Sequence, residues 1–249
     1  MKLYKLICFI YSTISFYIEN IFLKKYKIKK ASLENEGIKK LRINPNKIKL
    51  GEVQKEIKVN KYHIRRIYSD EDIFTFLDNL FDKNFRDMIR NHTGFNYSID
   101  YFGAYKNFPI EASDKNNGYY ANHYHFDKPY SKNFLKIFLP LDSISSSDGP
   151  LEIIKKKESE KIKAGKKNFS LAKKYYFTGE IGDVLLCKLN LCLHRAGIPK
   201  IGNSKHLIML QLNPSLNWQI SKDLYKRQFK IEPKFTGIKN LFTIQKKFN

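Results

Sequence analysis

The chain has 249 residues, a formal net charge of +22 from 46 basic and 24 acidic residues, and 42% hydrophobic residues. This length and hydrophobic content allow one large domain with a buried core and exclude an intrinsically disordered chain. The charge is compatible with an anionic partner, such as nucleic acid, a membrane surface or a phosphorylated substrate, although lysines spread along the whole chain more simply reflect its composition.

Residues 1–30 are predicted to form an amphipathic helix. Leu6 to Leu23 is mostly apolar, but Glu19 and Asn20 interrupt it, and polar residues recur every three or four positions as a narrow seam. Such a helix packs on its own domain, on a partner or on a membrane surface, so peripheral membrane contact through this segment is one hypothesis. The three cysteines of the chain form no disulfide framework, which favours a reducing, cytoplasmic location.

Residues 31–94 are expected to support the main domain. Ala31 to Leu50 is polar and basic with weak periodicity and is predicted to be irregular, whereas Val53 to Tyr68 is predicted to form strands. Ser69 is a helix cap, followed by acidic residues and then by apolar residues that fall near one helical face. We expect this helix to end at Gly94.

From Phe95 the pattern changes to short strands separated by turns. Besides Phe95 to Tyr101, strands are predicted at Phe134 to Leu141, Leu151 to Ile154, Tyr175 to Thr178, Val184 to Leu186, Leu191 to His194 and His206 to Leu212. Many short strands after a helical stretch favour a mainly β fold with helical support, a barrel or double-sheet jelly roll, whose core spans residues 95–218. Residues 31–218 would form one domain, followed by a basic C-terminal extension over residues 219–249.

His125 and Asp127 are the first candidates for metal ligands. Residues two apart on a strand share a face, so this imidazole and this carboxylate could bind one ion, and His194 at a later strand end could supply a third ligand. Two histidines and one carboxylate form the facial triad of non-haem Fe(II) oxygenases, which leaves positions open for a co-substrate and O2. His123 and His125 form a competing pair, as in cupin-like sites, but no glutamate ligand follows them.

Five motifs occur in an order that resembles the phytanoyl-CoA dioxygenase family, within the segment from Phe95 to Pro214. They are His125-Phe126-Asp127, Leu135 to Asp142, Asp148 to Ile153, Gly179 to Leu186, and His194 to Gly197. Each motif alone is common, and their order makes the resemblance specific.

The resemblance implies a double-stranded β-helix, Fe(II) held by His125, Asp127 and His194, and 2-oxoglutarate as co-substrate. The family usually has an arginine shortly after the distal histidine, which binds the far carboxylate of 2-oxoglutarate. Here Lys205 stands in that region, and a lysine binds a carboxylate without the two-pronged geometry of arginine. Arg195 is a second, lower-ranked cation, because it neighbours His194 in an extended segment and would face away.

The predicted function is therefore an Fe(II)- and 2-oxoglutarate-dependent dioxygenase that hydroxylates a small molecule. A lysine-rich segment from Lys155 to Lys174, read as a solvated loop or short helix, raises the hypothesis of an anionic substrate. One alternative is a nucleic-acid demethylase of the same chemistry, although the sequence has no compact arginine-rich stripe. The other is a non-catalytic β-barrel that serves as a membrane-surface or scaffold protein.

Overall fold

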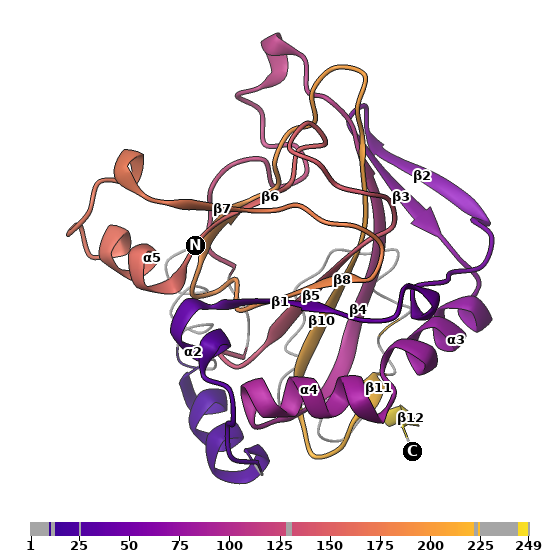
Figure 1. Ribbon diagram of the computed structural model, residues 1–249, viewed down its shortest axis with the longest axis vertical. Coiled ribbons are helices and arrows are strands. Elements are labelled where there is room, and N and C mark those ends of the chain that lie inside the picture. The colour runs from indigo at the N-terminus through magenta and orange to yellow at the C-terminus, as the bar shows by residue number, and fades with distance from the viewer. Residues whose placement is uncertain are drawn as a thin grey trace.

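Two β-sheets and a layer of helices make up the computed structural model (Figure 1), which describes residues 10, 13–24, 26–127, 131–221, 224 and 244–248. The large sheet contains β1 (Ile38–Arg42), β2 (Lys55–Asn60), β3 (His63–Ile67), β4 (Asn96–Asn107), β5 (Leu135–Pro140), β8 (Asp183–Cys187), β10 (Lys205–Ser215), β11 (Gln219–Ser221) and β12 (Ile244–Lys247). The small sheet contains β6 (Leu151–Ile154), β7 (Lys174–Phe177) and β9 (Leu193–Arg195). The longer helices are α2 (Ser32–Glu36), α3 (Asp70–Leu80), α4 (Lys83–Thr93) and α5 (Lys156–Lys163).

The large sheet runs in the order β1-β8-β5-β10-β4-β11-β12, with β3 also paired to β4 and β2 paired to β3. Its pairs are antiparallel except for β11 with β4. The small sheet has the order β7-β6-β9 and is also antiparallel. The prediction of a mainly β fold with helical support is confirmed.

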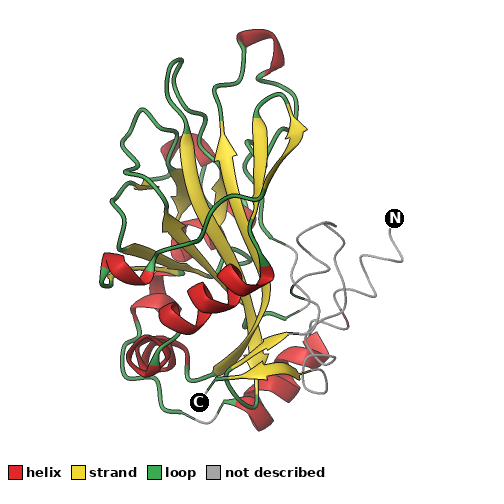
Figure 2. Ribbon diagram, turned by 90° about the vertical axis from the view of Figure 1, so that its right-hand side faces the viewer, coloured by secondary structure: helices red, strands yellow, loops and turns green. Residues whose placement is uncertain are grey.

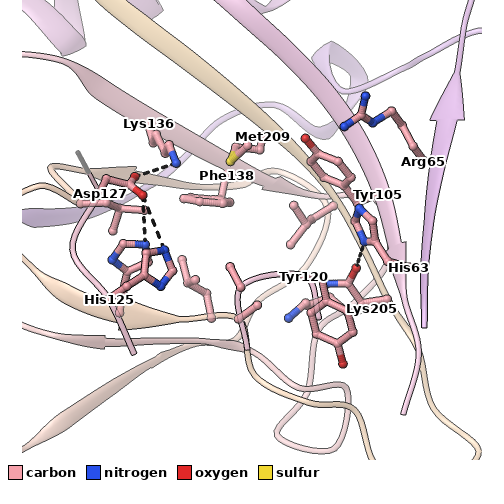
Figure 3. Close-up of a pocket in the computed structure, with 17 residues that line it drawn as sticks. His63, Arg65, Tyr105, Tyr120, His125, Asp127, Lys136, Phe138, Lys205 and Met209 are labelled. Carbon is pink, nitrogen blue, oxygen red and sulfur yellow. Dashed lines mark hydrogen bonds and ion pairs between the residues drawn. The ribbon is translucent and has the colours of Figure 1, made fainter. Parts of the chain in front are cut away.

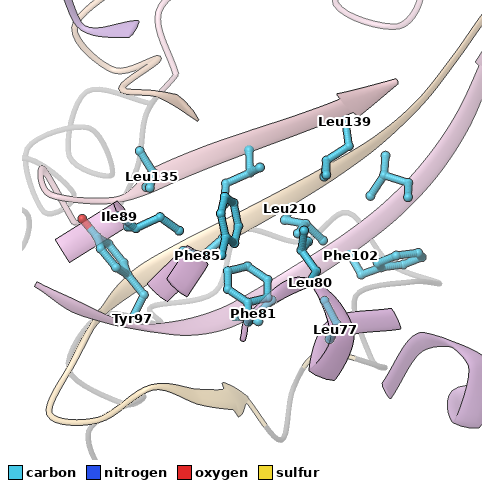
Figure 4. Packing of buried hydrophobic residues seen from close by; sticks show 14 of the residues in the cluster. Leu77, Leu80, Phe81, Phe85, Ile89, Tyr97, Phe102, Leu135, Leu139 and Leu210 are labelled. Atoms are coloured by element: carbon cyan, nitrogen blue, oxygen red, sulfur yellow. The ribbon is translucent and has the colours of Figure 1, made fainter. Parts of the chain in front are cut away.

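Residues alternate between the two faces of the large sheet, as a strand dictates. On β5, Leu135, Ile137 and Leu139 belong to the core cluster that α3 and α4 share with the sheet (Figure 4). Phe138 on the same strand belongs to a second cluster that includes Ile153 of the small sheet. The large sheet therefore lies between a helical layer and the small sheet.

The helical layer consists of two helices where the sequence predicted one. Ser69 accepts a hydrogen bond from the backbone of Asp72 and caps α3, as predicted. However, α3 ends at Leu80, and Asp82 caps a second helix, α4, by accepting from the backbone N–H of Phe85. A second capping residue inside the periodic stretch divides the helix. Figure 2 shows helices packed beside the lower half of the long strands.

The prediction that Ala31 to Leu50 is irregular was wrong. This segment contains α2 and β1, and β1 pairs antiparallel with β8 at the edge of the large sheet. Lys39 and Lys40 on β1 are not buried. Because an edge strand can carry exposed lysines, its sequence resembles that of a polar linker.

Both ends of the chain lie partly outside the described residues. Residues 1–9, 11 and 12 of the predicted N-terminal helix and residues 225–243 of the predicted extension are among those not described. Residues 219–221 form β11 and thus join the large sheet just past the expected core boundary at 218. In the described part of the chain, no helix combines the length and the apolar character needed to cross a membrane.

We expect truncation of Phe85, a buried aromatic residue of the helical layer, to lower the stability of the fold strongly. Phe85 is 1% exposed and packs beside Phe81 at a ring distance of 5.5 Å. Phe85→Ala should lower the free energy of unfolding by about 3–5 kcal/mol in a denaturant titration, because burial is lost and a cavity remains. Leu171→Ala, at a 73% exposed position, is the control and should stay within about 0.5 kcal/mol of the parent. Equal effects would contradict the packing.

Candidate metal centre

Two backbone hydrogen bonds bring His125 and His194 together. The His125 N–H donates to the carbonyl of His194 over 2.9 Å, and the His194 N–H donates to the carbonyl of His125 over 3.0 Å. His194 lies on β9, so this isolated antiparallel bridge places His125 beside the edge of the small sheet. The Asp127 N–H donates to the carbonyl of Leu189 over 3.2 Å, which fixes the backbone of the third candidate ligand.

The side chains of His125, Asp127 and His194 converge on one point, and Figure 3 shows His125 and Asp127 facing each other at one end of a pocket. One ligand atom from each of these residues lies within 4.8 Å of the others. The Asp127 Oδ1 atom is 3.6 Å from His125 Nε2 and 3.7 Å from His194 Nε2. Within the described part of the chain, this is the one group of at least three such side chains with metal-binding spacing.

Each imidazole is oriented by a backbone carbonyl. His125 Nδ1 is 2.8 Å from the carbonyl oxygen of His123, and His194 Nδ1 is 3.0 Å from that of Cys192. A carbonyl oxygen only accepts, so both Nδ1 atoms carry the proton, and the lone pair of each Nε2 faces Asp127. Metal-binding histidines are held in this way in proteins, and the donor set therefore fits a cation.

The charge state of the three groups also suits a metal. Burial alone would raise the pKa of Asp127, but Lys136, His125 and His194 outweigh it and hold that pKa well below its usual range. Burial lowers the pKa of His194 to about 4, so this imidazole is neutral at pH 7. The hydrogen bond to Asp127 raises the pKa of His125, so protons compete with a metal mainly at this ligand.

Lys136 on β5 reaches Asp127 from the large sheet. Its Nζ lies 2.6 Å from Asp127 Oδ2, which leaves Oδ1 as the oxygen nearest both histidines. The lysine thus orients the carboxylate so that a single oxygen points toward the two imidazoles. The sequence carries a signal for this residue, since it is the one charged side chain in the apolar strand Leu135–Pro140.

A cavity of about 320 Å³ extends from the three candidate ligands between the sheets. Phe138 and Met209 lie in its middle (Figure 3), and Leu151 and Leu189 are further apolar residues that line it. Its far end is polar and includes His63, Arg65, Tyr105, Asn107, Tyr120 and Lys205. This size and this mixture of apolar walls and few polar groups are typical of small-molecule sites.

Sequence reasoning missed most of the polar end. His63 and Arg65 alternate on β3, and β3 pairs with β4, which carries Tyr105 and Asn107. His63 stacks on Tyr105 at 5.0 Å, and its Nδ1 lies 2.6 Å from Asn107 Oδ1. Burial lowers the pKa of His63, so it is neutral at pH 7. The alternation on β3 was visible in the sequence, but its pairing partner was not.

Lys205 and Arg195 occupy different surroundings. Lys205 is 2% exposed at the start of β10, lines the cavity, and donates to the carbonyl oxygens of Gly149 and Gly197. Burial lowers the pKa of Lys205 to about 7. Arg195 instead forms an ion pair with Glu152 at 2.7 Å and does not line the cavity.

His123, the alternative ligand, points away from the other two histidines. Its side chain is exposed, and its Nε2 lies 3.2 Å from the carbonyl oxygen of Asn117. It does not belong to the metal-binding group, although it lies two residues from His125. Its backbone contributes through the carbonyl that orients His125.

No protein-family model matches the sequence. No curated protein matches it either. Among solved structures, the chain is similar to SnoN, the non-heme alpha ketoglutarate dependent epimerase from nogalamycin biosynthesis, with a TM-score of 0.53, 9% identity, and coverage of 72% of this chain and 78% of SnoN. A second SnoN structure, in complex with Fe3+, alpha ketoglutarate and nogalamycin RO, gives a TM-score of 0.52 at 8% identity, covering 72% of this chain and 80% of that one. The structure of EctD from S. alaskensis with bound Fe gives a TM-score of 0.48 at 15% identity, covering 73% of this chain and 74% of EctD.

The chain has the double-stranded β-helix, or jelly-roll, fold. This assignment is based on two facing sheets, antiparallel except for the pair of β11 with β4, and on the similarity to SnoN over most of both chains. At 9% identity the similarity concerns the fold alone. The narrower resemblance to the phytanoyl-CoA dioxygenase family still depends on the order of the sequence motifs.

The contact between Lys136 and Asp127 predicts a role in metal affinity. Lys136→Met should weaken Fe(II) binding by about 10–100-fold in an anaerobic calorimetric titration, because Asp127 loses the partner that orients it. Lys40→Met removes an ion pair with Asp183 on the same sheet and should leave the affinity unchanged. An unchanged or tighter affinity for Lys136→Met would contradict the orienting role.

Proposed function

We propose that this protein is an Fe(II)- and 2-oxoglutarate-dependent oxygenase that hydroxylates a small molecule. The observation that carries the proposal is the convergence of His125, Asp127 and His194 within 4.8 Å at one end of a cavity. Two imidazoles and one carboxylate on one side of an ion are the ligand set of non-haem Fe(II) oxygenases. SnoN, which has the same fold, is an alpha ketoglutarate dependent enzyme by its description, and this supports the same class here.

In this proposal His125 Nε2, Asp127 Oδ1 and His194 Nε2 hold the iron. Iron together with 2-oxoglutarate and O2 supplies the oxidation of a C–H bond, coupled to decarboxylation of the co-substrate to succinate. The chain supplies two imidazoles whose Nδ1 atoms are bound to backbone carbonyls, so that each Nε2 can bind the ion, and a carboxylate kept ionised with the help of Lys136. Apolar residues in the middle of the cavity limit the access of water.

Lys205 is our candidate for binding the far carboxylate of 2-oxoglutarate. An ammonium group has three donors, and two of them already bind the carbonyl oxygens of Gly149 and Gly197. The third is available to a carboxylate in the cavity that Lys205 lines. The two carbonyls hold the ammonium in place, which offsets part of the geometric freedom that distinguishes lysine from arginine.

The substrate in this proposal is a small molecule that carries an anionic group. A cavity of about 320 Å³ must hold both 2-oxoglutarate and the reacting part of the substrate, which limits the size of that part. Arg65, which is 6% exposed, and the neutral His63 lie at the polar end and could bind an anion there.

The metal site is tested by a matched pair of histidine substitutions. His125→Ala should abolish stoichiometric Fe(II) binding and the release of succinate from 2-oxoglutarate. Loss of a residue that hydrogen-bonds to a ligand lowers metal affinity about 10–100-fold, and loss of the ligand itself should lower it more. His123→Ala, two residues away, should retain both. Retention of Fe(II) by His125→Ala, or loss of Fe(II) by His123→Ala alone, would refute the proposed ligand set.

Lys205 predicts how 2-oxoglutarate binding depends on pH. Only the protonated amine attracts a carboxylate, and its pKa in the free protein is about 7, so the affinity is full below that pH. Above it, the dissociation constant should rise about tenfold per pH unit, until the pKa of the complex is passed. Calorimetry of the Fe(II)-loaded protein measures this profile.

The two candidate cations are separated by the same titration. Lys205→Met should bind 2-oxoglutarate weakly with a flat profile while still binding Fe(II), which shows that it is folded. Arg195→Met should keep the profile of the parent. Parent-like affinity in Lys205→Met together with weak binding in Arg195→Met would assign the carboxylate to Arg195.

A further inference from the structure

The N-terminal helical segment, residues 13–23, buries Ser15, Glu19 and Leu23 against the protein. Ser15 and Glu19 are buried, at 0% and 4% exposure. The Glu19 carboxylate accepts hydrogen bonds from Ser131 Oγ at 2.7 Å and Asn133 Nδ2 at 2.9 Å. Most amphipathic helices bury only an apolar side against the domain, whereas here two polar residues are buried together with Leu23.

The opposite side of the segment is apolar and exposed. Large side chains with 41–71% exposure are found within it at Ile14, Tyr17, Ile21 and Phe22, and next to it at Ile10 and Tyr26. We call these six residues the apolar ridge. Single exposed apolar residues are ordinary, but a contiguous helical row of them marks an interaction site.

The charges next to the apolar ridge are positive. Lys24, Lys27, Lys29 and Lys30 follow the helical segment and are exposed. The sequence of residues 1–30 contains seven lysines and one acidic residue, Glu19, and that residue is buried and hydrogen-bonded. The segment therefore presents apolar and cationic groups, and its one carboxylate is turned inward.

We propose that the apolar ridge and its lysines bind the surface of an anionic lipid bilayer. An exposed apolar helical row flanked by lysines is the combination with which interfacial helices bind anionic membranes, and the tyrosines suit the headgroup region. A second copy of the chain fits less well, because two copies paired through this face would bring Lys24, Lys27, Lys29 and Lys30 of each chain close together. The binding is peripheral and is independent of the proposed oxygenase activity.

Vesicle co-sedimentation of the full-length protein tests the apolar ridge. The parent should bind vesicles that contain phosphatidylserine, bind phosphatidylcholine vesicles weakly, and dissociate as salt is raised. Ile14→Ser combined with Ile21→Ser should weaken binding at least about tenfold, since both side chains would leave the lipid. Leu171→Ser combined with Ile201→Ser, at positions 73% and 94% exposed elsewhere, should bind as the parent does.

A charge-reversal pair tests the contribution of the local lysines. Lys27→Glu with Lys29→Glu should reduce binding strongly, whereas Lys55→Glu with Lys58→Glu on β2 changes the net charge equally and should reduce it little. Equal losses in both pairs would show a response to net charge alone and overturn the proposed site. The proposal would also be overturned if the parent protein did not bind phosphatidylserine vesicles. It would likewise be overturned if light scattering showed a dimer that the Ile14→Ser and Ile21→Ser substitutions dissociate.

Discussion

The two backbone hydrogen bonds between His125 and His194 position the candidate metal centre. They tie a loop that lies outside the named strands to the small sheet, so that two imidazoles from distant parts of the sequence lie with ring centres 4.3 Å apart. Asp127 follows two residues after the bridge and meets Lys136 of the large sheet. The site therefore depends on both sheets, and a shift of either backbone would separate the ligands.

The two faces of the large sheet have different roles: one packs against the helices, and the other lines the cavity. The face toward α3 and α4 is apolar, as with Leu135, Ile137 and Leu139 on β5. The face toward the small sheet mixes apolar residues with Lys136 on β5 and Lys205 on β10, and the cavity opens along it. Burial keeps His194 on β9 of the small sheet neutral and lowers the pKa of Lys205 on β10 to about 7.

The sequence predicted the strands between Phe134 and Leu212 and the three residues that converge at the candidate metal centre, because alternation and motif order are local signals. The strand β1 was missed, because its lysines face solvent at a sheet edge. The polar end of the cavity was missed for another reason: His63 and Arg65 reach it through the pairing of β3 with β4, which is a long-range contact. Lys136, which contacts Asp127, is recognisable in the sequence as the one charged residue of an otherwise apolar strand, but its partner is not.

The most direct test of the account is a crystal structure of the protein loaded anaerobically with Fe(II), with anomalous scattering recorded at the iron edge. The account predicts one anomalous peak, bound by His125 Nε2, one oxygen of Asp127 and His194 Nε2, with Lys136 still on the other Asp127 oxygen. An iron ion bound elsewhere, an iron ion bound by His123, or crystals with no iron at these three residues would contradict it.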